Sequence, residues 1–133
     1  MKVLVDTDVL LDVALDRAPH ASAAAALLDT LEQRPGSGFV AWHTLSNFYY
    51  LVRPKHGNKD AQQFVLELTR FLSVSPTDTE SVRVAGSLDM RDFEDAMQVA
   101  AALACGADVI ATRNTKDFRR SPVPGKSPEG LAS

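Results

Sequence analysis

With 133 residues, of which 45% are hydrophobic and 23% charged, the chain is long enough for one domain with its own core, and we expect a single domain over residues 1–133. Its net charge of −3 argues against a wholly basic nucleic-acid-binding face, although a cluster of acids can conceal a local basic rim. The lone Cys105 excludes an intramolecular disulfide and a multi-cysteine zinc site, and the lack of a long apolar segment predicts a cytoplasmic protein with no membrane partner.

Hydrophobic periodicity predicts short strands that alternate with longer helices along the chain. The expected elements, in order, are a strand from Lys2 to Val5, helices from Val9 to Leu15 and from Ala21 to Gln33, a strand from Phe39 to Trp42, helices from Thr44 to Val52 and from Lys59 to Phe71, a strand from Leu72 to Ser75, helices from Thr77 to Leu88 and from Asp92 to Ala104, and a strand from Asp108 to Ala111. Pro54 is expected to end one helix and Gly106 another. From Thr112 to Ser133 we expect a loop, with a short strand near Val123 and a turn around Pro128 to Leu131. This alternation indicates a three-layer α/β/α sandwich with a central parallel sheet of four or five strands.

Three oxygen-rich groups follow strands or begin helices, which is where ligand sites form in parallel sheets. Asp6 and Asp8 come directly after the first strand, and Asp92 and Asp95 begin the clearest helix, three residues apart and therefore on one face. The third group follows the fourth strand and consists of Thr112, Arg113, Asn114, Lys116 and Asp117. Helix capping is the alternative interpretation for Asp6, Asp8 and Asp92.

Taken together, these groups favour a metal site. Ligands that offer only oxygen suit Mg²⁺ or Mn²⁺, which bind through a few carboxylates and keep several waters. Such ions activate water and stabilise the charge that develops on a phosphate. The pattern therefore predicts metal-dependent hydrolysis of phosphodiester bonds.

Four ordered segments resemble the motifs of the PIN-domain family, particularly the VapC-type ribonuclease toxins of bacterial and archaeal toxin–antitoxin pairs. VDTDVLLD, from residue 5, is similar to the opening strand and first acid of that family. The stretch from Thr44 to Leu51 resembles the second motif, DFEDAMQVAAAL from residue 92 the third, and IATRNTKDF from residue 110 the fourth. The likeness covers nearly the whole chain.

This resemblance implies an endoribonuclease in which acids hold one or two Mg²⁺ or Mn²⁺ ions and cut RNA. It implies Asp6, Asp95 and Asp117 as metal ligands, Asp92 as a neighbouring carboxylate, and Thr112 and Asn114 as further site residues, with Asp8 placed behind them. Arg113 and Lys116 would contact the substrate. The implied partners are RNA, an antitoxin whose C-terminal segment blocks the acidic groove, and a second copy of the chain in a homodimer.

Asn47 departs from the pattern, because many family members carry Glu at this position. Asn keeps an oxygen ligand but loses the negative charge and the ability to act as a base. Thr44 and Asn47 also fit a capping-box-like helix start, which is the alternative for that pair.

Basic and aromatic residues offer further substrate contacts. Two basic groups have two possible interpretations, contact with RNA phosphates or an ordinary solvated surface. The first group is Arg53, Lys55, His56 and Lys59, and the second is Arg113, Lys116, Arg119 and Arg120. Trp42, Tyr49 and Tyr50 could stack on bases or pack in the core or a dimer.

Two other functions remain open. The segment from Val3 to Leu10 also resembles the opening motif of haloacid-dehalogenase-like phosphatases, in which Asp6 would be a nucleophile and Asp8 its acid/base partner. No later Gly-Asp motif with paired acids accompanies it. The second alternative, suggested by Asn47, is a PIN-like module that binds RNA or protein without cutting.

Overall fold

The computed structural model describes residues 1–131; the last two residues of the expected C-terminal loop and of the predicted domain, 132–133, lie outside the described residues. The strands are β1 (Val3–Val5), β2 (Gly38–Val40), β3 (Leu72–Val74), β4 (Val109–Ala111) and β5 (Gly125–Lys126). The helices are α1 (Thr7–Ala14), α2 (Ala21–Glu32), α3 (Trp42–His56), α4 (Asn58–Leu68), α5 (Thr79–Ser87), α6 (Phe93–Cys105), the 3₁₀ turn η1 (Thr115–Phe118) and α7 (Pro128–Leu131). None of these helices is long and apolar enough to span a membrane.

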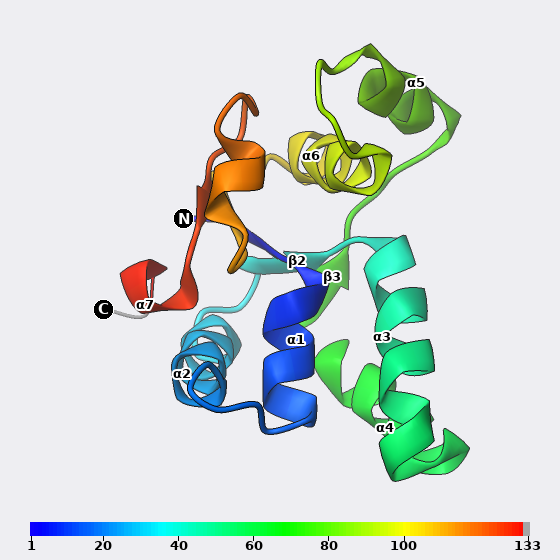
Figure 1. Ribbon diagram of the computed structural model, residues 1–133, viewed down its shortest axis with the longest axis vertical. Coiled ribbons are helices and arrows are strands. Elements are labelled where there is room, and N and C mark those ends of the chain that lie inside the picture. Colours follow the sequence, from blue (N-terminus) through cyan, green and yellow to red (C-terminus); the bar gives the residue numbers. More distant parts are fainter. Residues whose placement is uncertain (132–133) are drawn as a thin grey trace.

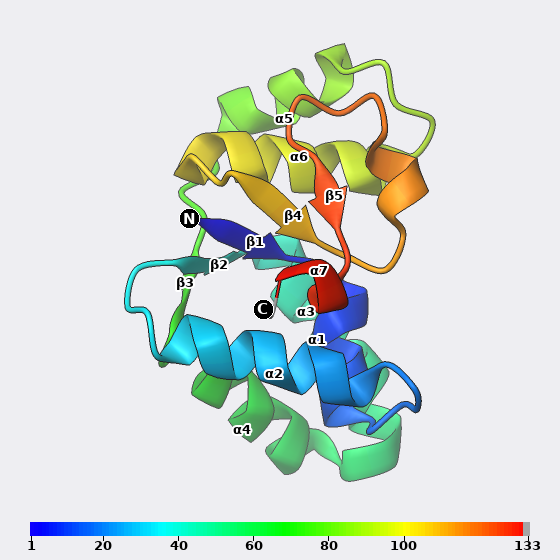
Figure 2. The same ribbon diagram turned by 90° about the vertical axis from the view of Figure 1, so that its left-hand side faces the viewer.

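The five strands form one parallel sheet in the order β3-β2-β1-β4-β5. Helices α1 to α4 cover one face, and α6, with α5 outside it, covers the other (Figures 1 and 2). β1 lies in the middle, and its residues alternate between the two layers: Val3 and Val5 join the core beneath α1 to α4, whereas Leu4 joins the core beneath α6. The predicted α/β/α sandwich with a parallel sheet is confirmed.

The predicted limits of two elements around β2 were wrong. β2 begins at Gly38, which the sequence pattern places in a break between elements. Glycine suits this strand position because it pairs with Leu72 of β3, and a Cβ here would lie 2.6 Å from Cδ2 of that residue. β2 ends at Val40, and Trp42, predicted as strand, is the first residue of α3. Pro54 lies inside α3, which continues to Gly57, where a φ of +85° ends it. A proline in the last turn removes a single helical hydrogen bond, so the helix can continue past it.

The remaining predicted elements are present, and their ends differ from the predicted ones by at most three residues. Gly106 ends α6 in the left-handed conformation, at φ +70°, as predicted. The expected strand near Val123 is β5, two residues further on, and the expected turn around Pro128 is α7.

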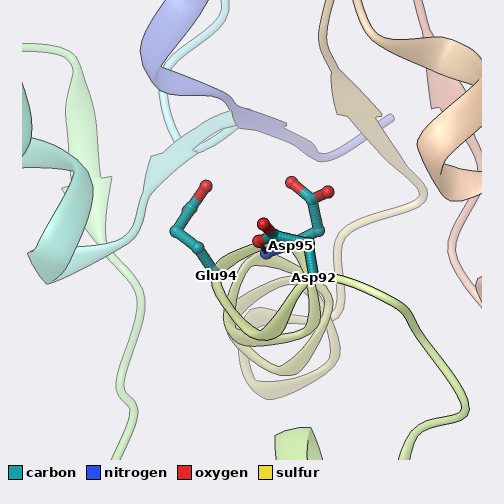
Figure 3. A group of neighbouring side chains, drawn as sticks. All are labelled: Asp92, Glu94 and Asp95. Atoms are coloured by element: carbon teal, nitrogen blue, oxygen red, sulfur yellow. Dashed lines mark hydrogen bonds between the residues drawn. The ribbon is translucent and has the colours of Figure 1, made fainter.

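The topology brings distant segments to one edge of the sheet. Because the strands are parallel, Asp6 after β1, Ala41 after β2 and Thr112 after β4 all leave at the same edge. The first turn of α6 also lies at this edge (Figure 3). The segments that carry the predicted acids therefore meet at one edge of the sheet.

Candidate metal centre

Asp6 ends β1 and caps α1, and its carboxylate is held by three donors. The backbone N–H of Thr7, the first residue of α1, donates to Oδ1 at 2.7 Å, so Asp6 caps the helix. The side-chain N–H of Gln98 donates to the same oxygen at 3.0 Å, and the hydroxyl of Thr112 donates to Oδ2 at 2.8 Å. Asp6 is therefore the N-cap of α1, and its side chain also contacts α6 and the loop after β4.

The environment of Asp6 disfavours its negative charge. Burial, followed by the charge of Asp8, raises the pKa of Asp6 from 3.8 to about 7, although the hydrogen bond from Thr112 acts in the opposite direction. Burial also raises the pKa of Asp8, whose Oδ2 accepts a hydrogen bond from the backbone N–H of Arg113 at 3.1 Å. Two acids so close in sequence, both destabilised as anions, suit a place where a cation supplies the compensating charge.

The first turn of α6 carries three carboxylates. Asp92 caps the helix by accepting a hydrogen bond from the backbone N–H of Asp95 at 3.0 Å. Asp92, Glu94 and Asp95 each offer an oxygen that lies within 4.8 Å of the others, and all three leave the helix on the side that faces the strands (Figure 3). Burial, followed by the charge of Asp92, raises the pKa of Asp95 to about 6.

Glu94 was absent from the predicted site residues. Its Oε2 lies 2.8 Å from Nε2 of His43. This contact joins the start of α3 to the start of α6. The negative charge of Glu94 also contributes to the raised pKa values of Asp6 and Asp95. The signal is present in the sequence, since Glu94 stands between the predicted site residues Asp92 and Asp95.

The loop after β4 carries the third oxygen-rich group. Thr112 is buried, whereas Asn114, Lys116 and Asp117 are exposed on or beside η1. Asp117 is close enough to Asp95 for its charge to raise the pKa of Asp95. A groove passes between this loop and α6 and is lined by Asp89, Met90, Arg91, Asp92, Asp95, Lys116, Asp117, Arg119 and Arg120. Acidic and basic side chains therefore line the same groove.

Arg113, predicted to contact substrate, points its guanidinium into the protein. Its Nε and Nη2 donate to the two carboxylate oxygens of Asp12, at 2.7 and 3.2 Å. Arg17, from the loop after α1, donates to the same carboxylate at 2.8 Å. Asp12 is fully buried, and with Arg113 it ties the loop after β4 to α1.

The second predicted motif lies on α3. Ala41 is the N-cap of this helix, so Thr44 sits inside the first turn, and the capping-box interpretation of Thr44 and Asn47 was wrong. Thr44 is fully buried, and its hydroxyl accepts a hydrogen bond from Gln98 at 2.8 Å. Asn47 lies one turn further along the helix and is exposed.

Residues of the basic and aromatic groups make contacts within the protein. The Arg53 guanidinium lies 5.1 Å from the ring centre of Tyr50, and Nε2 of His56 lies 3.1 Å from the carbonyl oxygen of Ala14. Tyr49 packs edge-on against Tyr50 and against the core, whereas Trp42 is exposed.

Comparison with known proteins decides the family. Residues 2–116 match the sequence profile of the PIN domain. The chain belongs to the PIN-domain family. A chain in the crystal structure of VapBC2 from Rickettsia felis, bound to a DNA fragment from their promoter, has the same fold, with a TM-score of 0.70 and 16% identity over 96% of this chain and 98% of that one. The search among curated proteins found no match.

Membership of the PIN-domain family also bears on the alternatives. It removes the support for a haloacid-dehalogenase-like phosphatase, which rested on the residues around Asp6 alone. The donor set of this PIN domain fits a divalent cation, because carboxylates with raised pKa values gather on α6 and at the end of β1. The carboxylates whose oxygens lie within 4.8 Å of one another are those of Asp92, Glu94 and Asp95. Of the predicted ligands Asp6, Asp95 and Asp117, one, Asp95, belongs to this cluster, and the assignment of all three stays a prediction.

Proposed function

We propose that this PIN domain is a Mg²⁺- or Mn²⁺-dependent endoribonuclease that hydrolyses phosphodiester bonds of single-stranded or structured RNA. The observation that carries the proposal is the convergence of acids from three separate segments at one edge of the sheet. Asp6 comes from the end of β1, Asp92, Glu94 and Asp95 come from the start of α6, and Asp117 comes from η1.

The protein's own residues have distinct tasks in this proposal. A bound Mg²⁺ or Mn²⁺ would supply an activated water and positive charge for the phosphate. Thr112 orients Asp6, and the Asp12–Arg113 pair holds the loop that carries Thr112 and Asp117. Lys116, exposed in the same groove, is placed to meet a backbone phosphate of the RNA.

The test is cleavage of RNA that contains both single-stranded and hairpin segments, in Mg²⁺ and in EDTA. We expect cleavage that requires the metal and falls by at least about 100-fold in Asp6→Asn and in Asp95→Asn, in keeping with loss of a stabilising charge. Asp60→Asn, an exposed acid at the start of α4, serves as the matched control and should cleave normally.

Two results would overturn the proposal. Cleavage that survives both substitutions would show that these acids are not the site. A wild-type protein that binds RNA without cutting it in either metal would instead establish the non-cleaving module, for which Asn47 in place of Glu is the rationale.

We also propose a toxin role with a cognate antitoxin as partner, and a homodimer. The support is the shared fold with a chain of VapBC2, together with PIN-domain membership. Co-expression with the product of the neighbouring reading frame should yield a complex in which RNA cleavage is suppressed. Sedimentation of the isolated chain at several concentrations tests the dimer, and a monomer throughout would exclude it.

A further inference from the structure

Gln98 is a polar side chain buried within the apolar part of α6. It is fully inaccessible to solvent, and its neighbours along the helix, Val99 and Ala101, belong to the core. Its side-chain nitrogen donates one hydrogen bond to Oδ1 of Asp6, at 3.0 Å, and another to Oγ1 of Thr44, at 2.8 Å. One amide group thus joins the end of β1, the first turn of α3 and α6.

The orientation of this amide follows from its neighbour. In the ionised form, which is the one that would bind a cation, the carboxylate of Asp6 only accepts hydrogen bonds, so the nitrogen of Gln98 has to face it. The carbonyl oxygen then points elsewhere, and it is buried without a hydrogen-bond partner among residues 1–131. An unpartnered buried oxygen costs about 1–3 kcal/mol. A role in packing does not account for this cost, because an apolar side chain of similar size would avoid it.

The hydrogen bonds also leave Asp6 with an unequal pair of oxygens. A carboxylate has about four lone-pair positions, two on each oxygen. The N–H groups of Thr7 and Gln98 use both positions on Oδ1, whereas Thr112 uses one of the two on Oδ2. The remaining position is on Oδ2.

We propose that Gln98 is a positioning residue that occupies Oδ1 of Asp6 and thereby directs Oδ2 alone toward a divalent cation. This inference rests on the proposed metal-dependent function. Gln98 touches neither cation nor substrate in this arrangement; it acts through Asp6, and Thr44 holds its second N–H.

The test measures Mn²⁺ binding to the whole protein without RNA, by the electron paramagnetic resonance signal of free Mn²⁺. Gln98→Met keeps the size of the side chain and removes both donors. We expect its Kd for Mn²⁺ to rise about 10- to 100-fold, the usual effect of losing a residue that orients a ligand. Its unfolding midpoint in EDTA should stay the same or rise, because the unpartnered oxygen is gone as well. Gln62→Met, at an exposed position of α4, is the matched control and should change neither quantity.

The outcomes separate this inference from the function on which it rests. If Asp6→Asn abolishes Mn²⁺ binding while folded Gln98→Met binds within about twofold of wild type, the metal site stands and the role of Gln98 is refuted. If the wild-type protein binds no Mn²⁺, both proposals fail.

A second variant guards against misfolding of the first. Thr44→Val removes the acceptor of the second N–H of Gln98 and leaves the contact with Asp6 in place. We expect a smaller rise in Kd, of roughly three- to tenfold. An unchanged Kd in Thr44→Val, should Gln98→Met not fold, would overturn the proposal.

Discussion

Replacing Asp12 by Ala tests how strongly one buried carboxylate holds the loop after β4. Asp12 has no exposed surface, and its two oxygens accept three hydrogen bonds from the guanidinium groups of Arg17 and Arg113. Removing it leaves two arginines without their partner and takes away the link between α1 and the loop that carries Thr112. The prediction is a large loss of stability from the removal of one buried carboxylate.

The magnitude follows from burial. Breaking a buried ion pair by removing one partner costs about 3–5 kcal/mol. The side chains of Arg17 and Arg113 are 38% and 31% exposed, so both can turn partly into water, and we expect the lower end of that range, about 3 kcal/mol. For a chain of this length the loss corresponds to a fall in Tm of roughly 10 °C.

Urea denaturation followed by circular dichroism measures the free energy of unfolding. Glu80→Ala is the control, because Glu80 pairs with Arg83 at 3.5 Å on the surface, with both side chains about 70% exposed. That variant should lose at most about 0.5 kcal/mol. If Asp12→Ala loses less than about 1 kcal/mol, the carboxylate is not the anchor that its contacts indicate, and the reasoning is refuted.

Three further predictions concern charge and backbone conformation. The pKa of Asp6 is raised from 3.8 to about 7, so the charge of Asp6 destabilises the folded protein above about pH 7, and protonation removes this cost as the pH falls. Between about pH 8 and about pH 5.5, the free energy of unfolding of the metal-free wild type, measured by urea titration, should rise by about 2 kcal/mol relative to that of Asp6→Asn. Parallel pH profiles of the two proteins would contradict this prediction. Lys116→Ala should raise KM for RNA and flatten its dependence on salt while kcat changes little; an unchanged salt slope would place Lys116 outside the substrate contact. Gly106→Ala forces a side chain into the left-handed conformation at φ +70° and should cost about 1 kcal/mol in thermal unfolding, with activity unaffected; equal stability would contradict the strain.

Local chemistry made much of the fold and of the site predictable. β1 could be recognised because a strand in the middle of a parallel sheet is buried on both faces and so is apolar at every residue. Gly106 and the acids of the first turn of α6 marked that helix, since caps act on the nearest residues in sequence. Asp6 and Asp95 could be predicted to lie near the sheet edge for a similar reason: acids that follow strands or begin the helices after them fall at that edge of a parallel sheet.

Contacts between distant segments decided the rest. Trp42 belongs to a helix because β2 ends at Val40 and Ala41 caps α3, and the close approach of Leu72 to Gly38 on the neighbouring strand joins residues 34 positions apart. Arg113 points toward Asp12, 101 residues away, and nothing in the neighbouring sequence distinguishes it from an arginine that faces a phosphate. In the sequence, Gln98 is one polar residue among the apolar residues of α6. The role proposed for it depends on its hydrogen bond to Asp6, 92 residues away in the sequence. The sequence by itself determined which segments carry acids to the sheet edge; only the tertiary structure decided which side chains meet there, because those partners come together through packing rather than through spacing along the chain.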